Sequence, residues 1–202
     1  MRLKSLRALA PVFSVVALLA ASPVCAGPAL ETVKGAAERA VQVLRDPNLL
    51  GKEKKKERVR RIKEVVDSIF DYQDMARRAL GSHWRRRTPA EQEEFTGLFR
   101  NFIENIYSDK MDLYEGEKIV FGKEVVEQDF AQVDSSVVTL KGEEFIIVYK
   151  LHRVDGKWKV YDAVIENISV INNYRSQFDR VINSSSYQDL VKRLREKLAV
   201  AG

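Results

Sequence analysis

The chain has 202 residues, of which 34 are Lys or Arg and 29 are Asp or Glu, and its formal net charge is +5 at pH 7. Residues 1–26 hold three of the basic residues and no acidic one, so removing them leaves 31 basic residues against 29 acidic ones. This near balance gives no general reason to expect nucleic-acid binding, and a single cysteine excludes a disulfide scaffold.

Residues 1–26 have the pattern of a cleaved secretory signal peptide, because a basic start is followed by an apolar run over 12–21 and then by small residues. The apolar run is too short to span a bilayer comfortably. Cys25 raises the alternative of a lipoprotein signal, but Val24 stands where that signal expects a small residue. We therefore expect an exported protein with a single domain over residues 27–202.

Three helices are predicted in the first part of this domain. Residues 28–45 carry one apolar stripe, and residues 52–69 begin very basic and become apolar. A shorter helix is expected over 70–80, where Gly81 would end it. The basic segment 52–61 is either a solvated helix face or a docking surface for an acidic partner or anionic head groups.

A long aromatic helix follows the basic link at residues 82–87. Thr88, Pro89 and Glu91 form a strong helix start, since Thr88 can cap the helix and Glu91 completes a capping box. The helix is predicted to run to about Tyr107 or beyond. It is the most aromatic element, with apolar side chains at Phe95, Leu98, Phe99, Phe102, Ile103 and Ile106.

From about residue 117 the apolar period changes to two, which is typical of β-strands. Four consecutive strands are predicted at residues 119–126, 131–140, 145–153 and 158–165. Asp155-Gly156 supplies a short hairpin signal between the last two. The chain is therefore predicted to be α+β, with N-terminal helices, a four-stranded antiparallel sheet and C-terminal helices packed over it.

The stretch 161–178 changes pattern midway, so a strand is predicted to run almost directly into an amphipathic helix. Its apolar side chains at helical spacing are Ile168, Ile171, Tyr174 and Phe178. A last helix is expected over residues 187–198.

The sequence offers few candidate catalytic groups. His83 and His152 are far apart in the sequence, and no zinc-protease, P-loop, dinucleotide-binding or nucleophile-elbow motif is present, so we expect neither a metal site nor a cofactor. Asp162 and Glu166 flank the strand-to-helix junction. Asp162 could act as a general base if it faced a pocket, or it could simply cap a turn or pair with a nearby arginine. Periodicity alone does not distinguish a close-packed apolar core from a cavity lined by the same residues.

Five segments together resemble the MlaC family, also called the toluene-tolerance auxiliary component family. They are residues 70–72 (FDY), 75–81 (MARRALG), Trp84, 88–92 (TPAEQ) and the closing motif 158–178 (WKVYDAVIENISVINNYRSQF). The resemblance covers roughly residues 59–198. The chain departs from the family pattern at Asn167, where a glycine is common.

The resemblance implies a fold like those of nuclear transport factor and cystatin. It also implies a non-enzymatic periplasmic carrier that moves phospholipid between the outer membrane and an inner-membrane ABC transporter complex and so maintains outer-membrane lipid asymmetry. The expected partners are the phospholipid cargo, that transporter and an outer-membrane lipoprotein complex, with no nucleic acid and no membrane-spanning segment. A related branch of the family accompanies hopanoid biosynthesis, so the lipid class stays open. Two other hypotheses are a periplasmic adaptor whose apolar band merely packs, and an enzyme that uses Asp162.

Under the carrier hypothesis, the apolar side chains of the long helix, the strands and the closing motif are expected to line a lipid pocket. They are Phe99, Phe102, Ile106, Tyr107, Phe145, Ile147, Tyr149, Tyr161, Ala163, Ile165, Ile168, Tyr174 and Phe178. On the last strand, the face with Tyr161, Ala163 and Ile165 is predicted to line the pocket, because the opposite face carries Asp162.

Overall fold

The computed structural model describes residues 27–111, 114 and 116–200. The predicted signal peptide therefore lies outside the described residues. Among the residues described, no helix is long and apolar enough to cross a membrane.

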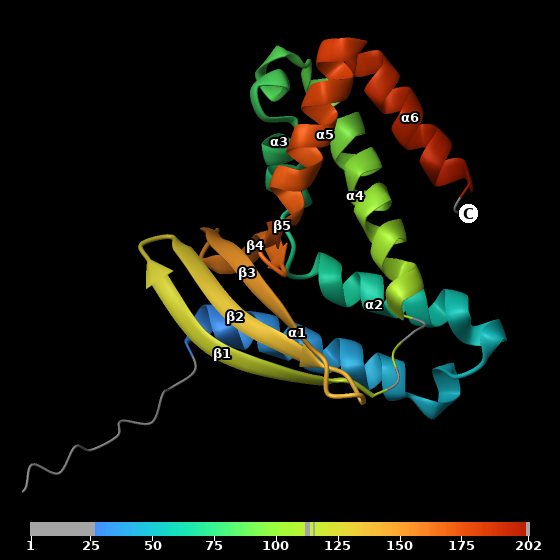
Figure 1. Cartoon of the computed structure of the whole chain (residues 1–202), viewed down its shortest axis with the longest axis vertical. Helices are drawn as coiled ribbons and strands as arrows, with labels where there is room; N and C mark the ends of the chain where they lie inside the picture. The colour runs from blue at the N-terminus through green and yellow to red at the C-terminus, as the bar shows by residue number, and fades with distance from the viewer. Residues whose placement is uncertain (1–26, 112–113, 115, 201–202) are drawn as a thin grey trace, which may run out of the picture.

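Within the described residues, six α-helices are present, four before a single β-sheet and two after it (Figure 1). They are α1 (Pro28–Arg45), α2 (Lys55–Asp67), α3 (Tyr72–Leu80), α4 (Pro89–Met111), α5 (Val170–Ser184) and α6 (Tyr187–Val200). Three short 3₁₀ turns, η1 (Pro47–Leu49), η2 (Lys52–Lys54) and η3 (Gly81–Arg86), connect the N-terminal helices.

The sheet is antiparallel, and its strands follow one another in sequence order. They are β1 (Lys118–Glu127), β2 (Phe130–Val138), β3 (Glu144–Val154), β4 (Lys157–Ile165) and β5 (Ile168–Ser169). The α+β class is confirmed. The expectation of four strands was one short, because a two-residue β5 pairs with the end of β4.

Two apolar cores organise the molecule. In one, α1 packs along a face of the sheet, and its Val33 is buried with Leu151 of β3 and Val160 of β4. In the other, α3, α4, α5 and α6 pack against one another at one end of the sheet. Figure 1 shows this helical bundle standing above the sheet, with α2 running between it and α1. The space between the cores is bounded by helices α1 to α4 and by the sheet.

The capping box at the start of α4 forms as predicted. Thr88 N–H donates to Glu91 Oε2 at 2.8 Å, and Glu91 N–H donates to Thr88 Oγ1 at 3.2 Å. The hydrogen bond from the Thr88 backbone lowers the pKa of Glu91. Because both bonds lie within four residues of chain, local sequence was sufficient to predict them.

A bulge in β4 decides which of its side chains face the helices. Leu151 of β3 pairs with Val160, whereas Lys150 pairs with Asp162, so Tyr161 has no opposite residue. The extra residue shifts the alternation by one position. Val160 before the bulge and Ala163 after it consequently share the helix-covered face.

This bulge corrects the prediction that Tyr161, Ala163 and Ile165 share one face. Ala163 and Ile165 pair with Tyr149 and Ile147 on the helix-covered face, but Tyr161 packs elsewhere. Its ring lies 5.4 Å from that of His152, centroid to centroid. Strict period-two alternation, on which the prediction rested, holds only where the ladder is unbroken.

A tight turn at Glu166 and Asn167 joins β4 to β5. Their φ angles are +49° and +65°, which is the left-handed pair that a two-residue hairpin turn requires. Asparagine tolerates this region well, so a glycine is not needed at position 167. The turn places Ile168 in β5 with 61% of its surface exposed. The prediction that Ile168 belongs to the helical stripe was therefore wrong, since Ser169 caps α5 one residue later by accepting from Asn172 N–H.

Candidate functional site

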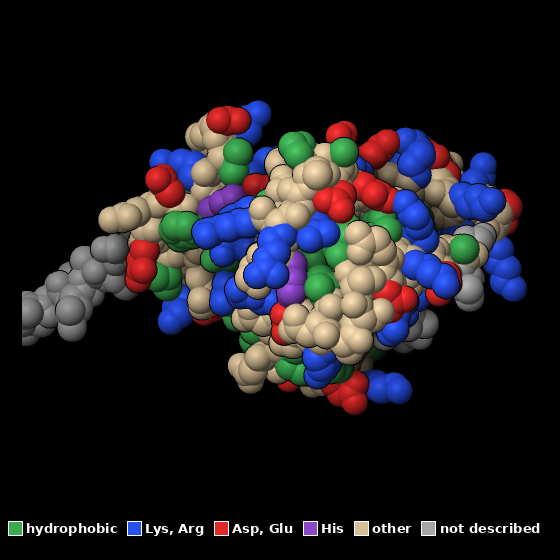
Figure 2. Space-filling model, turned by 90° about the horizontal axis from the view of Figure 1, so that it is seen from above, with side chains coloured by type: hydrophobic (Ala, Val, Ile, Leu, Met, Phe, Trp, Pro, Cys, Tyr) green, Lys and Arg blue, Asp and Glu red, His purple; other side chains and the backbone are tan. Residues whose placement is uncertain are grey.

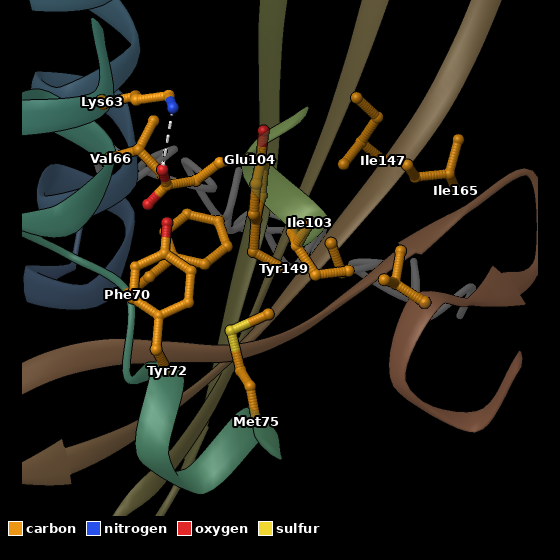
Figure 3. Close-up of a pocket in the computed structure, with 12 residues that line it drawn as sticks. Lys63, Val66, Phe70, Tyr72, Met75, Ile103, Glu104, Ile147, Tyr149 and Ile165 are labelled. Carbon is orange, nitrogen blue, oxygen red and sulfur yellow. Dashed lines mark ion pairs between the residues drawn. The ribbon is translucent and has the colours of Figure 1, made fainter. Parts of the chain in front are cut away.

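The first apolar cavity lies between the sheet and helices α2, α3 and α4 (Figure 3). Its volume is about 230 Å³. Helical residues Val66, Met75 and Ile103 form one wall, while Tyr149 of β3 and Ala163 of β4 lie on the sheet side. The lining is therefore almost entirely apolar, which suits a hydrocarbon ligand.

The second apolar cavity lies between α1, α2 and strands β1 to β3, with a volume of about 720 Å³. Small residues of α1, including Ala36 and Ala40, form its floor, and Phe145 of β3 lies on the sheet side. Alanine side chains leave the helix backbone some distance from the sheet without filling the gap. The space is within the range of roughly 300–1,000 Å³ that small-molecule sites occupy.

The two cavities adjoin. Val66, Phe70, Ile147 and Tyr149 line both of them. Figure 3 shows Tyr149 standing between Phe70 on one side and Ile147 on the other. Burial raises the pKa of the Tyr149 phenol, so this side chain is neutral at physiological pH.

One end of the first cavity is polar. Lys63 Nζ lies 3.1 Å from Glu104 Oε2, and Arg100 Nε donates to Glu104 Oε1 at 2.7 Å (Figure 3 shows the first pair). The Glu104 side chain is only 8% exposed, and a buried carboxylate needs such compensation. Arg100 also pairs with Asp67. Burial raises the pKa of Asp67 and that of the neighbouring Tyr72.

A family model described as MlaC protein matches residues 34–196 of this chain. The chain belongs to the MlaC family. The match begins within α1 and ends within α6, so it includes all lining residues of the two cavities except Val33.

Two known proteins are similar to this chain, each at low sequence identity. The intermembrane phospholipid transport system binding protein MlaC of Haemophilus influenzae is 23% identical over 124 residues, which are 59% of this chain and 58% of that protein. A phospholipid-binding protein from Ralstonia solanacearum, solved in complex with a phospholipid, has a TM-score of 0.75 and 23% identity. That alignment covers 87% of this chain and 99% of the solved one, and it shows that the two share a fold.

The sheet residues predicted to line a pocket in this MlaC-family chain lie mostly on the cavities. Ile147 and Tyr149 line both, Ala163 and Ile165 line the first, and Phe145 lines the second. Whether any of them contacts lipid stays a prediction.

The predicted helical residues lie elsewhere. Phe99, Phe102, Tyr174 and Phe178 pack ring against ring in the bundle core, and Phe102 and Tyr174 have centroids 5.2 Å apart. Ile106 packs against the same core. The side chain of Tyr107 is outside the described part of the structure.

Several cavity residues were not among the predicted site residues. Phe70 and Met75, next to the bundle, and the α1 residues Val33, Ala36 and Ala40 are the main ones. The only sequence signal for the α1 residues was the apolar stripe of that helix, and a packed core explains such a stripe equally well. The second cavity shows that part of this stripe faces a space that the protein's own side chains do not fill.

Asp162, the residue considered as a general base, has a structural role. Its side chain is on the opposite face of β4 from Ala163, and the residue is 4% exposed. Oδ1 accepts from Ile171 N–H at 3.1 Å, and Oδ2 accepts from Ser169 Oγ at 2.7 Å. Asp162 thus stabilises the start of α5. Within the described residues, no group of three or more His, Cys, Asp or Glu could hold a metal ion.

Proposed function

We propose that this chain is a non-enzymatic phospholipid carrier of the periplasm, which moves lipid between the outer membrane and an inner-membrane ABC transporter complex. The observation that carries the proposal is the pair of adjoining apolar cavities between the sheet and helices α1 to α4. Membership of the MlaC family supports it, as does the name of the relative from Haemophilus influenzae.

The energetics favour transfer from site to site over release into water. Each buried methylene contributes roughly 0.8 kcal/mol, so two long acyl chains gain roughly 20 kcal/mol gross, near the ceiling for non-covalent affinity. A lipid held in this way exchanges only with another apolar site. The carrier therefore has to dock on its donor and its acceptor, here an outer-membrane lipoprotein complex and the transporter. No cofactor is needed, since the phospholipid is the cargo.

Native mass spectrometry of the protein purified from bacterial cells tests this function. We expect a complex whose added mass matches one two-chain phospholipid, and chemical extraction should identify its class. A hopanoid mass would place the chain in the related branch. The apo mass alone, both before and after mild delipidation, would contradict the carrier function and favour an adaptor with a packed interior.

A further inference from the structure

A third hollow, polar and separate from the two apolar cavities, lies where α3, η3 and α5 meet. Its volume is about 580 Å³. Arg77 and Arg78 reach it from α3, Arg85 from η3 and Arg175 from α5, and Trp84 forms part of its wall. We call it the arginine hollow. Figure 2 views the molecule from this end and shows Lys and Arg side chains gathered beside the two histidines.

The Arg175 side chain lies close to Gly81. Gly81 ends α3 with φ +56°, and a Cβ placed on it would lie 2.8 Å from Arg175 Nε. Any side chain at position 81 would therefore displace the guanidinium. Arg175 therefore lies against the end of α3, and it has no carboxylate partner within the part of the chain that is described.

Positive charge in the arginine hollow is only partly neutralised. Arg77 Nε donates to Asp74 Oδ1 at 2.7 Å, and Arg78 Nε donates to Asp74 Oδ2 at 2.5 Å. Arg85, like Arg175, has no ion pair with any described residue. The residues that line the hollow include four arginines and no carboxylate, so an excess of positive charge faces the space.

A smaller neighbouring hollow of about 150 Å³ extends the same charge. It shares Arg78 and Arg175 with the arginine hollow and adds Lys150. Its one carboxylate, Asp162, already accepts from Ile171 N–H and from the Ser169 hydroxyl. The basic segment 52–61 differs from the arginine hollow, because two of its arginines, Arg60 and Arg61, form ion pairs with Glu57.

We propose that the arginine hollow is an anion site for a phosphate group. Guanidinium groups donate in a planar fork that matches phosphate oxygens, and such charge-assisted pairs are stronger than neutral hydrogen bonds. Arginines from three separate elements converge here, so one phosphate group can be contacted from several sides. The hollow is larger than a free phosphate ion, and a phosphate carried on a lipid head group also fits it. The site does not depend on the proposed carrier function.

Phosphate binding is measured on the purified protein at constant ionic strength, with sodium phosphate titrated against sodium chloride and heat or arginine Nε–H NMR shifts as the readout. A second arm measures co-sedimentation with vesicles of phosphatidylglycerol in phosphatidylcholine and with phosphatidylcholine alone. The test variant is Arg85→Gln with Arg175→Gln. The matched control is Arg86→Gln with Arg180→Gln. It removes the same charge from two exposed arginines that lie on the same two elements, η3 and α5, but do not line the hollow.

We expect saturable binding of phosphate or of the anionic vesicles that weakens about tenfold or more in the test variant and less than about twofold in the control. Binding to free phosphate identifies a soluble source, and binding to anionic vesicles alone identifies lipid head groups. Equal loss in both variants would show only diffuse charge attraction and overturn the site. The site is also overturned if neither probe binds, and a remaining role for the arginines would then be contact with an acidic protein surface.

Discussion

Tyr149 of β3 and Ala163 of β4 lie directly opposite each other in the sheet, and both side chains line the first cavity. Residues paired across antiparallel strands project from the same face. Because the bulge at Tyr161 intervenes, the residue two positions before Ala163 does not share that face. This register yields the first prediction.

Ala163→Phe should fill the first cavity opposite Tyr149 and lower the amount of co-purified lipid severalfold, because the ring takes space that an acyl chain would need. The measurement is the lipid-to-protein ratio together with a denaturant melt. Tyr161→Ala is the comparison, since it removes the ring contacts with Phe130 and His152 without touching either cavity. We expect it to keep its lipid, and an equal loss of lipid in both variants would contradict the register argument.

Ala40→Trp in α1 should obstruct the second cavity, which Ala40 lines. An indole placed between α1 and the sheet occupies space that an acyl chain would need, so lipid occupancy measured by native mass spectrometry should fall severalfold. Glu38→Trp adds the same group on the exposed side of α1 and should leave occupancy unchanged. Full occupancy in Ala40→Trp would mean that the second cavity does not hold cargo.

Glu104→Gln should destabilise the protein by about 2–4 kcal/mol, because the buried carboxylate compensates both Lys63 and Arg100. Equilibrium urea unfolding measures this change. Glu64→Gln serves as the control, since the Glu64 side chain is 59% exposed in its pair with Arg60. Exposed pairs contribute about 0–1 kcal/mol. Similar losses for the two variants would show that the burial of Glu104 has little energetic weight.

Asp74 should make stability depend on pH under acid conditions. Burial opposes ionisation, but the hydrogen bonds from Arg78 and Arg77 prevail and lower the pKa of Asp74 below its ordinary value. A lowered folded-state pKa gives stability that is present above the unfolded pKa, about 3.9, and is lost as the pH falls through the folded value.

Asp74→Asn should therefore lower the free energy of unfolding at pH 7 and flatten its decline below about pH 4. Thermal melts from pH 7 to pH 2.5 measure both effects. Asp155→Asn, in the exposed turn between β3 and β4, should leave the profile unchanged. If the stability of Asp74→Asn declined with falling pH in parallel with that of the unmodified protein, Asp74 would not be the source of the pH dependence.

Local sequence was enough to predict most helices and strands of this protein. The capping box at Thr88, the helix-ending Gly81 and the Asp155-Gly156 turn depend on contacts within a few residues, and all three are present. The α+β class followed from the change of apolar period near residue 117. The family also followed from short motifs, and the family model that matches residues 34–196 confirmed it.

The assignment of apolar residues to core or cavity depended on tertiary structure. Phe99, Phe102, Tyr174 and Phe178 are packed ring against ring, whereas Ile147 and Tyr149 face open space, although both sets follow the regular period of their elements. A period tells which face of an element is turned inward, but the gap beyond that face is set by elements distant in the sequence. The bulge at Tyr161 and the exposure of Ile168 also depended on tertiary structure. Pairing between strands decides the strand register and the left-handed turn that produce them.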